Sequence, residues 1–437
     1  MLPALYLALR PTPSIAKSHE VGEILNQGDL IEAVKHIEQS WEEEYEEYFG
    51  RNLADETTTV DSIARTLLAL GRETGKKPAL LYMLPSPDGL KVILVTEDGP
   101  IHRQIPEANR ETLLEVAKKF RGDITNPRKR HTRSYLENAQ QLYQWAIAPI
   151  ESALEEQGIE TLVFCVGSGL RSIPFAALHD GEEFLVEKYS MGQIPAFKLV
   201  DTLYGDVRNS QVLAMGASEF QELPPLPAVP VELSAIVCKN QSRPCPFWQG
   251  QRFLNQGFTL EHLKSLLDEQ KFQIVHLATH AEFLSGDPDS SYIQLWDSKL
   301  TMNRMGELDL GDPPLELLVL SACKTAIGDK EAELGFGGLA VNSGVKSALA
   351  SLWYVSDSGT LALMAQFYRN LQTAPIKAEA LRQAQLALIR EEVSLENGEL
   401  RGSRGSLPLP PELRQSGREN LSHPYYWAAF TMIGSPW

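Results

Sequence analysis

Apolar residues in the first 72 positions recur with the spacing of amphipathic helices. Between residues 23 and 49, the interval is close to 3.6 residues, at Ile24, Leu25, Leu30, Ile31, Val34, Ile37 and Trp41. Gly28-Asp29 interrupts this stripe, and Asp29 is placed to cap the longer second part. A further helix is predicted at Val60–Leu70, ending at Gly71. We therefore expect residues 1–72 to form an N-terminal helical segment.

From residue 73 to 205 the pattern alternates between strand-like and helix-like segments. In order, the expected elements are strands at Ala79–Leu84, Leu90–Thr96 and Ile101–Ile105, helices at Leu113–Phe120 and Tyr135–Gln157, and a strand at Thr161–Val166. The turn sequence Ser86-Pro87-Asp88-Gly89 predicts a hairpin between the first two strands. The basic loop Arg128–His131 is expected to be exposed and mobile. This part of the chain is therefore predicted to be an α/β unit.

The segment from residue 206 to 437 shows a second α/β pattern. Strands are expected at Gln211–Gly216, Phe272–Ala278, Tyr292–Trp296, Leu315–Leu320 and Ser347–Trp353, and helices at Val231–Val237, Leu260–Leu267, Leu361–Leu371 and Lys377–Arg390. Pro224–Pro230 predicts a stiff linker, Gly328–Gly338 an acidic, mobile lid, and Asn397–Gln415 a flexible segment rich in Gly, Ser and Pro. The whole pattern favours the α/β class, with a mostly parallel sheet flanked by helices.

Two of these apolar runs lead into residues that can carry chemistry. Phe272–Ala278 leads into Thr279-His280-Ala281, and Leu315–Leu320 leads into Ser321-Ala322-Cys323. In an open α/β sheet, functional groups gather at the carboxyl ends of the strands. The spacing of the two sites, 323 − 280 = 43 residues, leaves room for a crossover connection between neighbouring strands. We therefore expect the His and the Cys to meet at one edge of the sheet.

A cysteine beside a histidine can form a catalytic dyad, in which the thiol is the nucleophile and the imidazole is the base. A free thiol has a pKa of about 8.5 and becomes a good nucleophile when an imidazole stabilises its thiolate. Cys323 alone would more often be a small buried side chain, and the partnership with His280 is what favours catalysis. His276 lies four residues earlier and faces the same side of an ideal strand. We expect His276 to be buried and structural.

The sequence around the pair resembles a known family. His276-Leu277-Ala278-Thr279-His280 and Leu320-Ser321-Ala322-Cys323-Lys324-Thr325 look like the motifs of the CHAT domain, a caspase-like cysteine peptidase relative that is also similar to separase. The segments Leu170–Gly181, Ser351–Asp357 and His423–Phe430 resemble further parts of that family. The resemblance covers roughly Val21 to Trp437.

This resemblance implies a caspase-like fold with an inactive, pseudo-protease lobe at residues 73–205 before an active protease lobe at 206–437. It assigns His280 and Cys323 as catalytic residues. It also assigns the oxyanion donors, which are the backbone N–H groups of Cys323 and Ala281. Many relatives have Gly where this chain has Ala281, and an Ala there keeps its backbone donor in place only with a negative φ.

The resemblance also points to the residues that select the substrate. Asp357 is expected at the floor of a pocket for Arg or Lys, held by charge-assisted hydrogen bonds. Its alternative role is the N-cap of a following helix, a role open to Ser356 as well. Trp353 is expected either to form the apolar wall of this substrate pocket or to belong to the core.

Composition narrows the class of partner and the compartment. A net charge of −17 over 437 residues argues against nucleic acid or an anionic membrane as partner. The cysteines, Cys165, Cys238, Cys245 and Cys323, form no CxxC motif, so neither a zinc site nor a disulfide framework is indicated. Cys238 and Cys245 are interpreted as two thiols, although they are close enough in sequence to pair.

No apolar run reaches the length of a membrane span. Met1–Ala8 is a poor signal peptide, although it could be the stub of a longer N-terminal region. We expect a cytoplasmic protein.

These observations favour one function over a rival of another class. The predicted function is a cysteine endopeptidase that cuts after Arg or Lys through a Cys–His dyad and a thioester intermediate. The alternative is a catalytically silent scaffold of the same fold that acts in protein–protein interaction or signalling. The expected partner is a protein substrate, with room left for a regulatory protein, and the chemistry needs no metal or organic cofactor. A calcium or allosteric requirement stays open.

Overall fold

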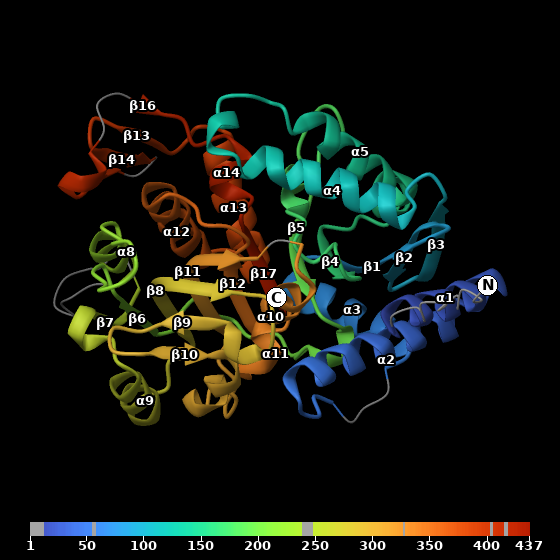
Figure 1. Ribbon diagram of the computed structural model, residues 1–437, viewed down its shortest axis with the longest axis horizontal. Helices are drawn as coiled ribbons and strands as arrows, with labels where there is room; N and C mark the ends of the chain where they lie inside the picture. Colours follow the sequence, from blue (N-terminus) through green and yellow to red (C-terminus); the bar gives the residue numbers. More distant parts are fainter. Residues whose placement is uncertain (1–12, 55–57, 238–247, 327, 403–404, 415–417) are drawn as a thin grey trace, which may run out of the picture.

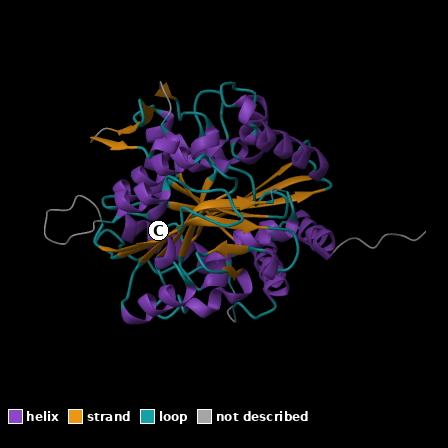
Figure 2. Cartoon of the chain, turned by 60° about the vertical axis from the view of Figure 1, so that its left-hand side comes forward, coloured by secondary structure: helices purple, strands orange, loops and turns teal. Residues whose placement is uncertain are grey.

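The computed structural model of the protein describes residues 13–54, 58–237, 248–326, 328–402, 405–414 and 418–437, without the side chains of residues 13–19, 322, 323 and 418. Cys238 and Cys245, whose pairing was left open, lie outside these residues. Within the described part, one sheet of thirteen strands dominates, in the order β10-β9-β8-β11-β12-β17-β5-β4-β1-β2-β3, with β6 paired to β8 and β7 to β6. Helices cover both faces of this sheet (Figures 1 and 2). The α/β prediction is confirmed.

One half of the sheet comes from the first half of the chain. Its strands are β1 (Pro78–Ser86), β2 (Gly89–Thr96), β3 (Gly99–Ile105), β4 (Thr161–Val166) and β5 (Ser190–Ile194). β1 and β2 form the predicted hairpin, with Ser86 opposite Gly89 across a two-residue turn. Every residue of β1, β2 and β4 is buried. These strands therefore lie between two layers of helices.

The other half contains the two strands that carry the predicted chemistry. Its strands are β6 (Val212–Gly216), β7 (Gly250–Leu254), β8 (Ile274–Phe283), β9 (Tyr292–Gln294), β10 (Lys299–Thr301), β11 (Leu317–Thr325), β12 (Ser347–Ser351) and β17 (Phe430–Gly434). β8 and β11 are parallel neighbours, and β6 runs parallel to β8 on its other side.

The helices divide between the two faces (Figure 1). On the upper face in that view lie α4 (Arg110–Thr125), α5 (Leu136–Ala146), α8 (Val229–Ile236), α12 (Asp357–Leu371), α13 (Lys377–Ile389) and α14 (Pro424–Trp427). On the lower face lie α1 (Pro13–Asn26), α2 (Leu30–Phe49), α3 (Val60–Thr74), α9 (Leu260–Glu269) and α11 (Leu339–Ser343). Further helices are α6 (Glu151–Glu156), α7 (Leu185–Lys188) and α10 (Lys330–Gly337). Asp29 caps α2 as predicted, accepting from the backbone N–H of Glu32 at 3.0 Å.

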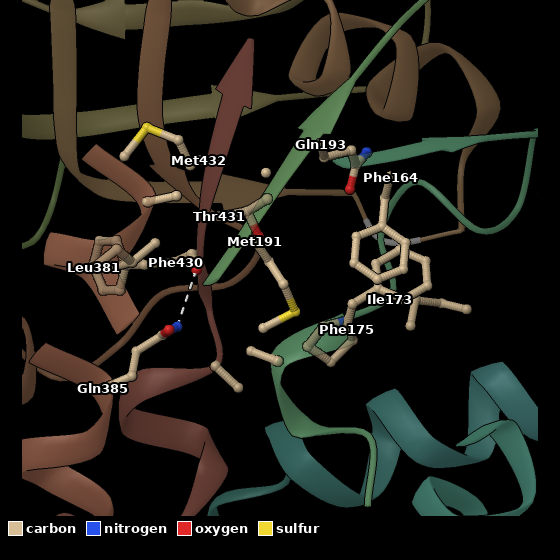
Figure 3. Close-up of a pocket in the computed structure, with 15 residues that line it drawn as sticks. Phe164, Ile173, Phe175, Met191, Gln193, Leu381, Gln385, Phe430, Thr431 and Met432 are labelled. Atoms are coloured by element: carbon tan, nitrogen blue, oxygen red, sulfur yellow. Dashed lines mark hydrogen bonds between the residues drawn. The ribbon is translucent and has the colours of Figure 1, made fainter. Parts of the chain in front are cut away.

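A single seam joins the two halves of the sheet. β17 lies between β12, to which it is antiparallel, and β5, to which it is parallel. Close packing beside the seam leaves no room at Gly192, where an added Cβ would lie 2.8 Å from the Cβ of Pro436. Met191, Phe430 and Met432 line a small cavity of about 30 Å³ there (Figure 3). The predicted lobes 73–205 and 206–437 therefore share one sheet, and the boundary between them stays a prediction.

Three segments rich in Gly, Pro or polar residues make more contacts than their composition suggests. Gly328–Gly338, expected as a mobile lid, contains α10, whose residues Ala332 to Gly337 are all buried. Asn397–Gln415, expected to be flexible, takes part in a small sheet, whose strands are β13 (Ser394–Glu396), β14 (Glu399–Gly402), β15 (Gly405–Pro408) and β16 (Arg418–Glu419). Pro224–Pro230, expected as a stiff linker, runs into α8 and contacts His280. The mobility expected of the first two segments stays a prediction.

The acidic end of α2, residues 41–48, is partly buried. Glu38, which precedes it, accepts hydrogen bonds from Tyr82 Oη at 2.7 Å and from the backbone N–H groups of Phe197 and Lys198, each at 2.9 Å. Burial raises the pKa of Glu38 despite these bonds. Glu42 pairs with Lys198, and Glu44 with Arg171. The N-terminal segment is thereby tied to the first half of the sheet by buried charges.

Among the described helices, none combines the length and the apolar character that a bilayer crossing requires.

Candidate active site

The register of β8 and β11 brings His280 and Cys323 to the same level of the sheet. Ala322 lies opposite His280, and Cys323 lies opposite Ala281. The register shifts by one residue between Leu320 and Ala322, because β8 carries one extra residue there. Both strands also continue beyond the expected positions, β8 to Phe283 and β11 to Thr325. The prediction that the strands end at His280 and Cys323 was therefore wrong. The backbone nevertheless places these two residues on neighbouring strands at adjacent positions.

The imidazole of His280 is held by a backbone carbonyl. Its Nε2 atom lies 2.8 Å from the oxygen of Pro224. Because a carbonyl oxygen only accepts, Nε2 carries the hydrogen, and Nδ1 holds the lone pair of the neutral ring. The ring lies between two aromatic side chains, with centroids 4.8 Å from Phe220 and 6.3 Å from Tyr354. This ring is half-buried, fixed in orientation, and left with Nδ1 as its proton acceptor.

His276 lies deeper on the same side of the sheet. It is fully buried, and its Nε2 lies 2.9 Å from Oε1 of Glu232, a residue of α8. The ring also packs edge-on against Tyr368 of α12 at 5.4 Å. The expected burial of His276 is confirmed, and its partners belong to the core.

Asp357 lies near His280 at the start of α12. The N-cap of this helix is Ser356, whose Oγ accepts from the backbone N–H of Gly359 at 3.3 Å. The capping alternative for Asp357 is therefore wrong. Its carboxylate accepts from Tyr354 Oη at 2.5 Å and from the backbone N–H of Ala228 at 3.5 Å. Burial raises the pKa of Asp357, although these hydrogen bonds and the charge of His280 act to lower it.

Trp353 and Ala281 complete the predicted set. Trp353 is buried, and its Nε1 donates to the carbonyl of Tyr425 at 3.1 Å. The structure thus gives Trp353 a core environment next to Tyr354. The described non-glycine residues with positive φ are Asn255, Asp309, Glu391 and Asn397. Ala281 has the negative φ that a side chain at this position requires.

The segment that follows β11 is anchored through Glu333 of α10. The Glu333 carboxylate accepts from Ser172 Oγ at 2.5 Å and from the backbone N–H of Gly169 at 2.9 Å, and lies 4.0 Å from the guanidinium of Arg121. Its side chain is 1% exposed. α10 is therefore fixed to the first half of the sheet.

For the Cys323–His280 contact and for metal binding, the structure bears only on the described residues. The side chain of Cys323 lies outside the described part of the structure, so the thiolate–imidazole contact stays a prediction. Within the described residues, no group of three or more His, Cys, Asp or Glu side chains is arranged to hold a metal ion.

Sequence reasoning missed two groups at this site. Tyr354 stood in the quoted motif without a role, although its spacing of three residues from Asp357 could have suggested a contact across the start of the helix. The carbonyl of Pro224 had no signal at all, because any residue type supplies a backbone carbonyl. It lies 56 residues before His280.

The chain has a separase-like, caspase-like fold. The chain aligns with two crystal structures of the Saccharomyces cerevisiae separase–securin complex, with TM-scores of 0.52 and 0.54 at 10% identity. The alignments cover 97% and 94% of this chain, but only 36% and 34% of the matched chain. The protein thus spans about a third of the length of the structures it matches, and the likeness concerns the fold alone.

The family follows from the sequence itself. A model of the CHAT domain matches residues 136–435. The chain therefore belongs to the CHAT-domain family, as its motifs predicted, although the match is narrower than the expected span from Val21 to Trp437. No curated protein matches the chain.

Proposed function

We propose that this protein is a cysteine endopeptidase that cleaves peptide bonds after Arg or Lys. The observation that carries this proposal is the neighbouring placement of Cys323 and His280 on parallel strands, with the His280 ring held by Pro224. The held tautomer leaves Nδ1 free to take the thiol proton. Membership in a family of caspase-like fold agrees with this chemistry.

In the proposed reaction, the Cys323 thiolate attacks the carbonyl carbon of the scissile bond. The protonated His280 then gives its proton to the leaving amine, and the carbonyl re-forms as a thioester. Water, deprotonated by His280, hydrolyses the thioester and releases the acid and the thiol. Backbone N–H groups of Cys323 and Ala281 are the proposed donors to the oxyanion.

Asp357 is the proposed partner of the basic substrate side chain. Its carboxylate lies close enough to His280 for the two charges to interact, and it has no lysine or arginine partner among the described residues. A guanidinium or ammonium group would bond to the same carboxylate that Tyr354 now contacts. Trp353, buried directly before Tyr354, is proposed to back the wall of this pocket.

The test is cleavage of a fluorogenic peptide with Arg before the scissile bond, together with labelling by an acyloxymethyl ketone of the same sequence. Cys323→Ala and His280→Ala should each abolish turnover while leaving the melting temperature close to that of the wild type. The label should map to Cys323 and spare Cys165, which is buried and whose pKa burial raises well above its usual range. Turnover retained in either variant would remove the dyad. A wild-type protein that neither cleaves nor labels would favour the silent scaffold.

A further inference from the structure

A polar cavity of about 520 Å³ lies between the α4–α5 connection, the start of α7 and the segment before α14. None of its lining residues belongs to β8 or β11, the strands of the candidate active site. Its walls carry five side chains that are or can become cationic, namely Arg130, His131, Arg133, His179 and His423. The volume is typical of small-molecule sites. The basic loop Arg128–His131, expected to be mobile, is held here, because the Arg130 guanidinium packs on the ring of Tyr425 at 5.0 Å.

Two of the histidines are oriented as hydrogen-bond donors towards a ligand. His423 Nδ1 accepts from the backbone N–H of Tyr425 at 3.1 Å, and His179 Nδ1 accepts from that of Gly181 at 3.0 Å. Each neutral ring therefore carries its hydrogen on Nε2. His423 is only 9% exposed, and its Nε2 is buried without a hydrogen bond of good geometry among the described residues. The nearby backbone of Thr132 interacts with the ring and acts to raise its pKa, so a bound acceptor would have to compete with this weak contact.

The charges in the cavity favour an anion over a metal ion. Burial lowers the pKa of His423 to about 4, and the charges of His131 and Arg130 act in the same direction. Burial also lowers the pKa of His179, and the charge of Arg133 adds to this effect while Asp180 and Glu187 oppose it. Two guanidinium groups would repel a cation, and no metal-binding cluster exists in the described part of the chain.

Acidic residues at the cavity offset part of its positive charge. Glu187 keeps its charge while accepting from the backbone N–H of Phe184 at 2.8 Å, and with Asp180 it acts to raise the pKa of His179. Glu182 is exposed. The basic side chains fall into two groups, Arg130 with His131 and His423, and Arg133 with His179, so a ligand with more than one negative charge can contact a guanidinium in each group.

We propose that this cavity binds a small molecule bearing phosphate groups, and that its occupancy alters the segment from Trp353 to Asp357. Guanidinium groups match phosphate oxygens through paired, charge-assisted hydrogen bonds. The Nε2–H groups of the two histidines supply further donors. The binding step does not depend on the proposed peptidase activity.

A short chain of contacts links the cavity to the candidate active site. Arg130 lies over the Tyr425 ring, whose hydroxyl donates to the carbonyl of Tyr354 at 3.2 Å. The carbonyl of Tyr425 accepts from Trp353 Nε1 at 3.1 Å. Tyr354 in turn contacts Asp357 and stacks near His280. A ligand that draws Arg130 into the cavity changes its packing on Tyr425, and through Tyr425 the backbone of Tyr354.

The test uses inorganic tripolyphosphate as the probe and calorimetric titration of the full chain, with sodium chloride at equal ionic strength as the reference. Saturable binding is expected, and Arg133→Gln should weaken it by about tenfold or more, equivalent to about 1.4 kcal/mol. Arg128→Gln is the matched control, because Arg128 is exposed on the same loop and does not line the cavity. Its affinity should stay within about twofold of the wild type.

Hydrogen exchange tests the link separately from any catalysis. Tripolyphosphate should change amide exchange at Trp353–Asp357 in the wild type and leave it unchanged in Arg133→Gln. Equal loss of binding in Arg128→Gln and Arg133→Gln would mean surface charge alone, and would overturn the proposal. Absence of saturable binding would do the same. Binding without any change at Trp353–Asp357 would overturn the link. Loss of peptidase activity in the dyad variants bears on none of these outcomes.

Discussion

At the scale of single residues, the candidate active site contains an ionisable side chain whose burial disfavours its charged form. This residue is Asp357, whose carboxylate is partly buried beside His280 and bonded to Tyr354 rather than to a lysine or arginine. A carboxylate in that position gains most when a cation reaches it. This is the physical argument for a substrate with a basic side chain.

Asp357→Ala is expected to lower kcat/KM for peptides with Arg before the scissile bond by about 30-fold to several-thousand-fold. The reason is that removing one partner of a desolvated ion pair costs about 2–5 kcal/mol. Tyr354→Phe serves as the matched control, since it removes a contact of the carboxylate but keeps the charge. The measurement is a scan of the residue before the scissile bond for all three proteins. A wild type that prefers Asp or a large apolar residue would rule out the basic pocket.

Lys377 offers a residue-scale test of burial that is independent of catalysis. Its ammonium group is 1% exposed, and Glu316, 3.5 Å away, is shared with Lys346 at 2.8 Å. Burial lowers the pKa of Lys377 from 10.5 to about 8. Between these values, the unfolded chain binds a proton that the folded chain does not, so the stability contributed by this group rises with pH.

Lys377→Met is therefore expected to unfold at higher urea concentration than the wild type at pH 7. The advantage should shrink as the pH rises from about 8 to about 10.5, by up to about 3 kcal/mol for a shift of this size. Urea unfolding of both proteins across this range measures the change. A difference in unfolding free energy that stays constant with pH would contradict the assigned burial of the charge.

At the scale of elements, α10 shows how a helix can be fixed by one buried carboxylate. Glu333→Ala is expected to cost about 2–5 kcal/mol of unfolding free energy, because it leaves Ser172 Oγ and the amide of Gly169 without their acceptor and Arg121 without its counter-charge. Glu331→Ala on the same helix is the control and should cost less than about 1 kcal/mol. Urea unfolding measures both. Equal costs for the two variants would show that the carboxylate does not anchor the helix.

The sequence predicted the regular elements better than the segments rich in Gly, Pro and polar residues. The runs at Thr161–Val166 and Leu361–Leu371 match β4 and the body of α12, because their apolar periodicity reflects burial directly. α10 was missed because its glycines suggested mobility, whereas Leu334 and Phe336 bury it. α3 extends past the expected stop at Gly71 to Thr74, since Gly75 rather than Gly71 takes the left-handed cap.

For the candidate site, the sequence predicted residue types and strand neighbours but not the contacts that orient them. The placement of His280 and Cys323 on adjacent strands followed from the two apolar runs and the family motifs. The Pro224 carbonyl that holds His280 could not be predicted, because it depends on a distant backbone group. The strand lengths were underestimated because polar residues such as Lys324 continue a ladder without any apolar signal.

At the scale of the whole molecule, β17 makes the two halves of the sheet dependent on each other. Gly192→Ala is expected to destabilise the protein by about 1–3 kcal/mol, because the new methyl group would overlap Pro436 in a packed region. Gly122→Ala is the control, since nothing lies within 4 Å of a Cβ there, and it should stabilise α4 by about 0.5–1 kcal/mol.

Differential scanning calorimetry of the full chain measures both variants and the coupling itself. A single transition, with equal calorimetric and van't Hoff enthalpies, is expected for the wild type, and Gly192→Ala should shift it as a whole. Two resolved transitions, of which Gly192→Ala moves only one, would show that the halves unfold independently.

The position of β17 also sets the order in which the sheet can be completed during synthesis. β5 and β12 both leave the ribosome before residues 430–434, and each exposes an unpaired edge until those residues arrive. Because β17 fills the gap between them, the nascent chain cannot close its sheet while the strands that carry His280 and Cys323 are already made. A half-made chain would thus carry both His280 and Cys323 before its sheet is complete.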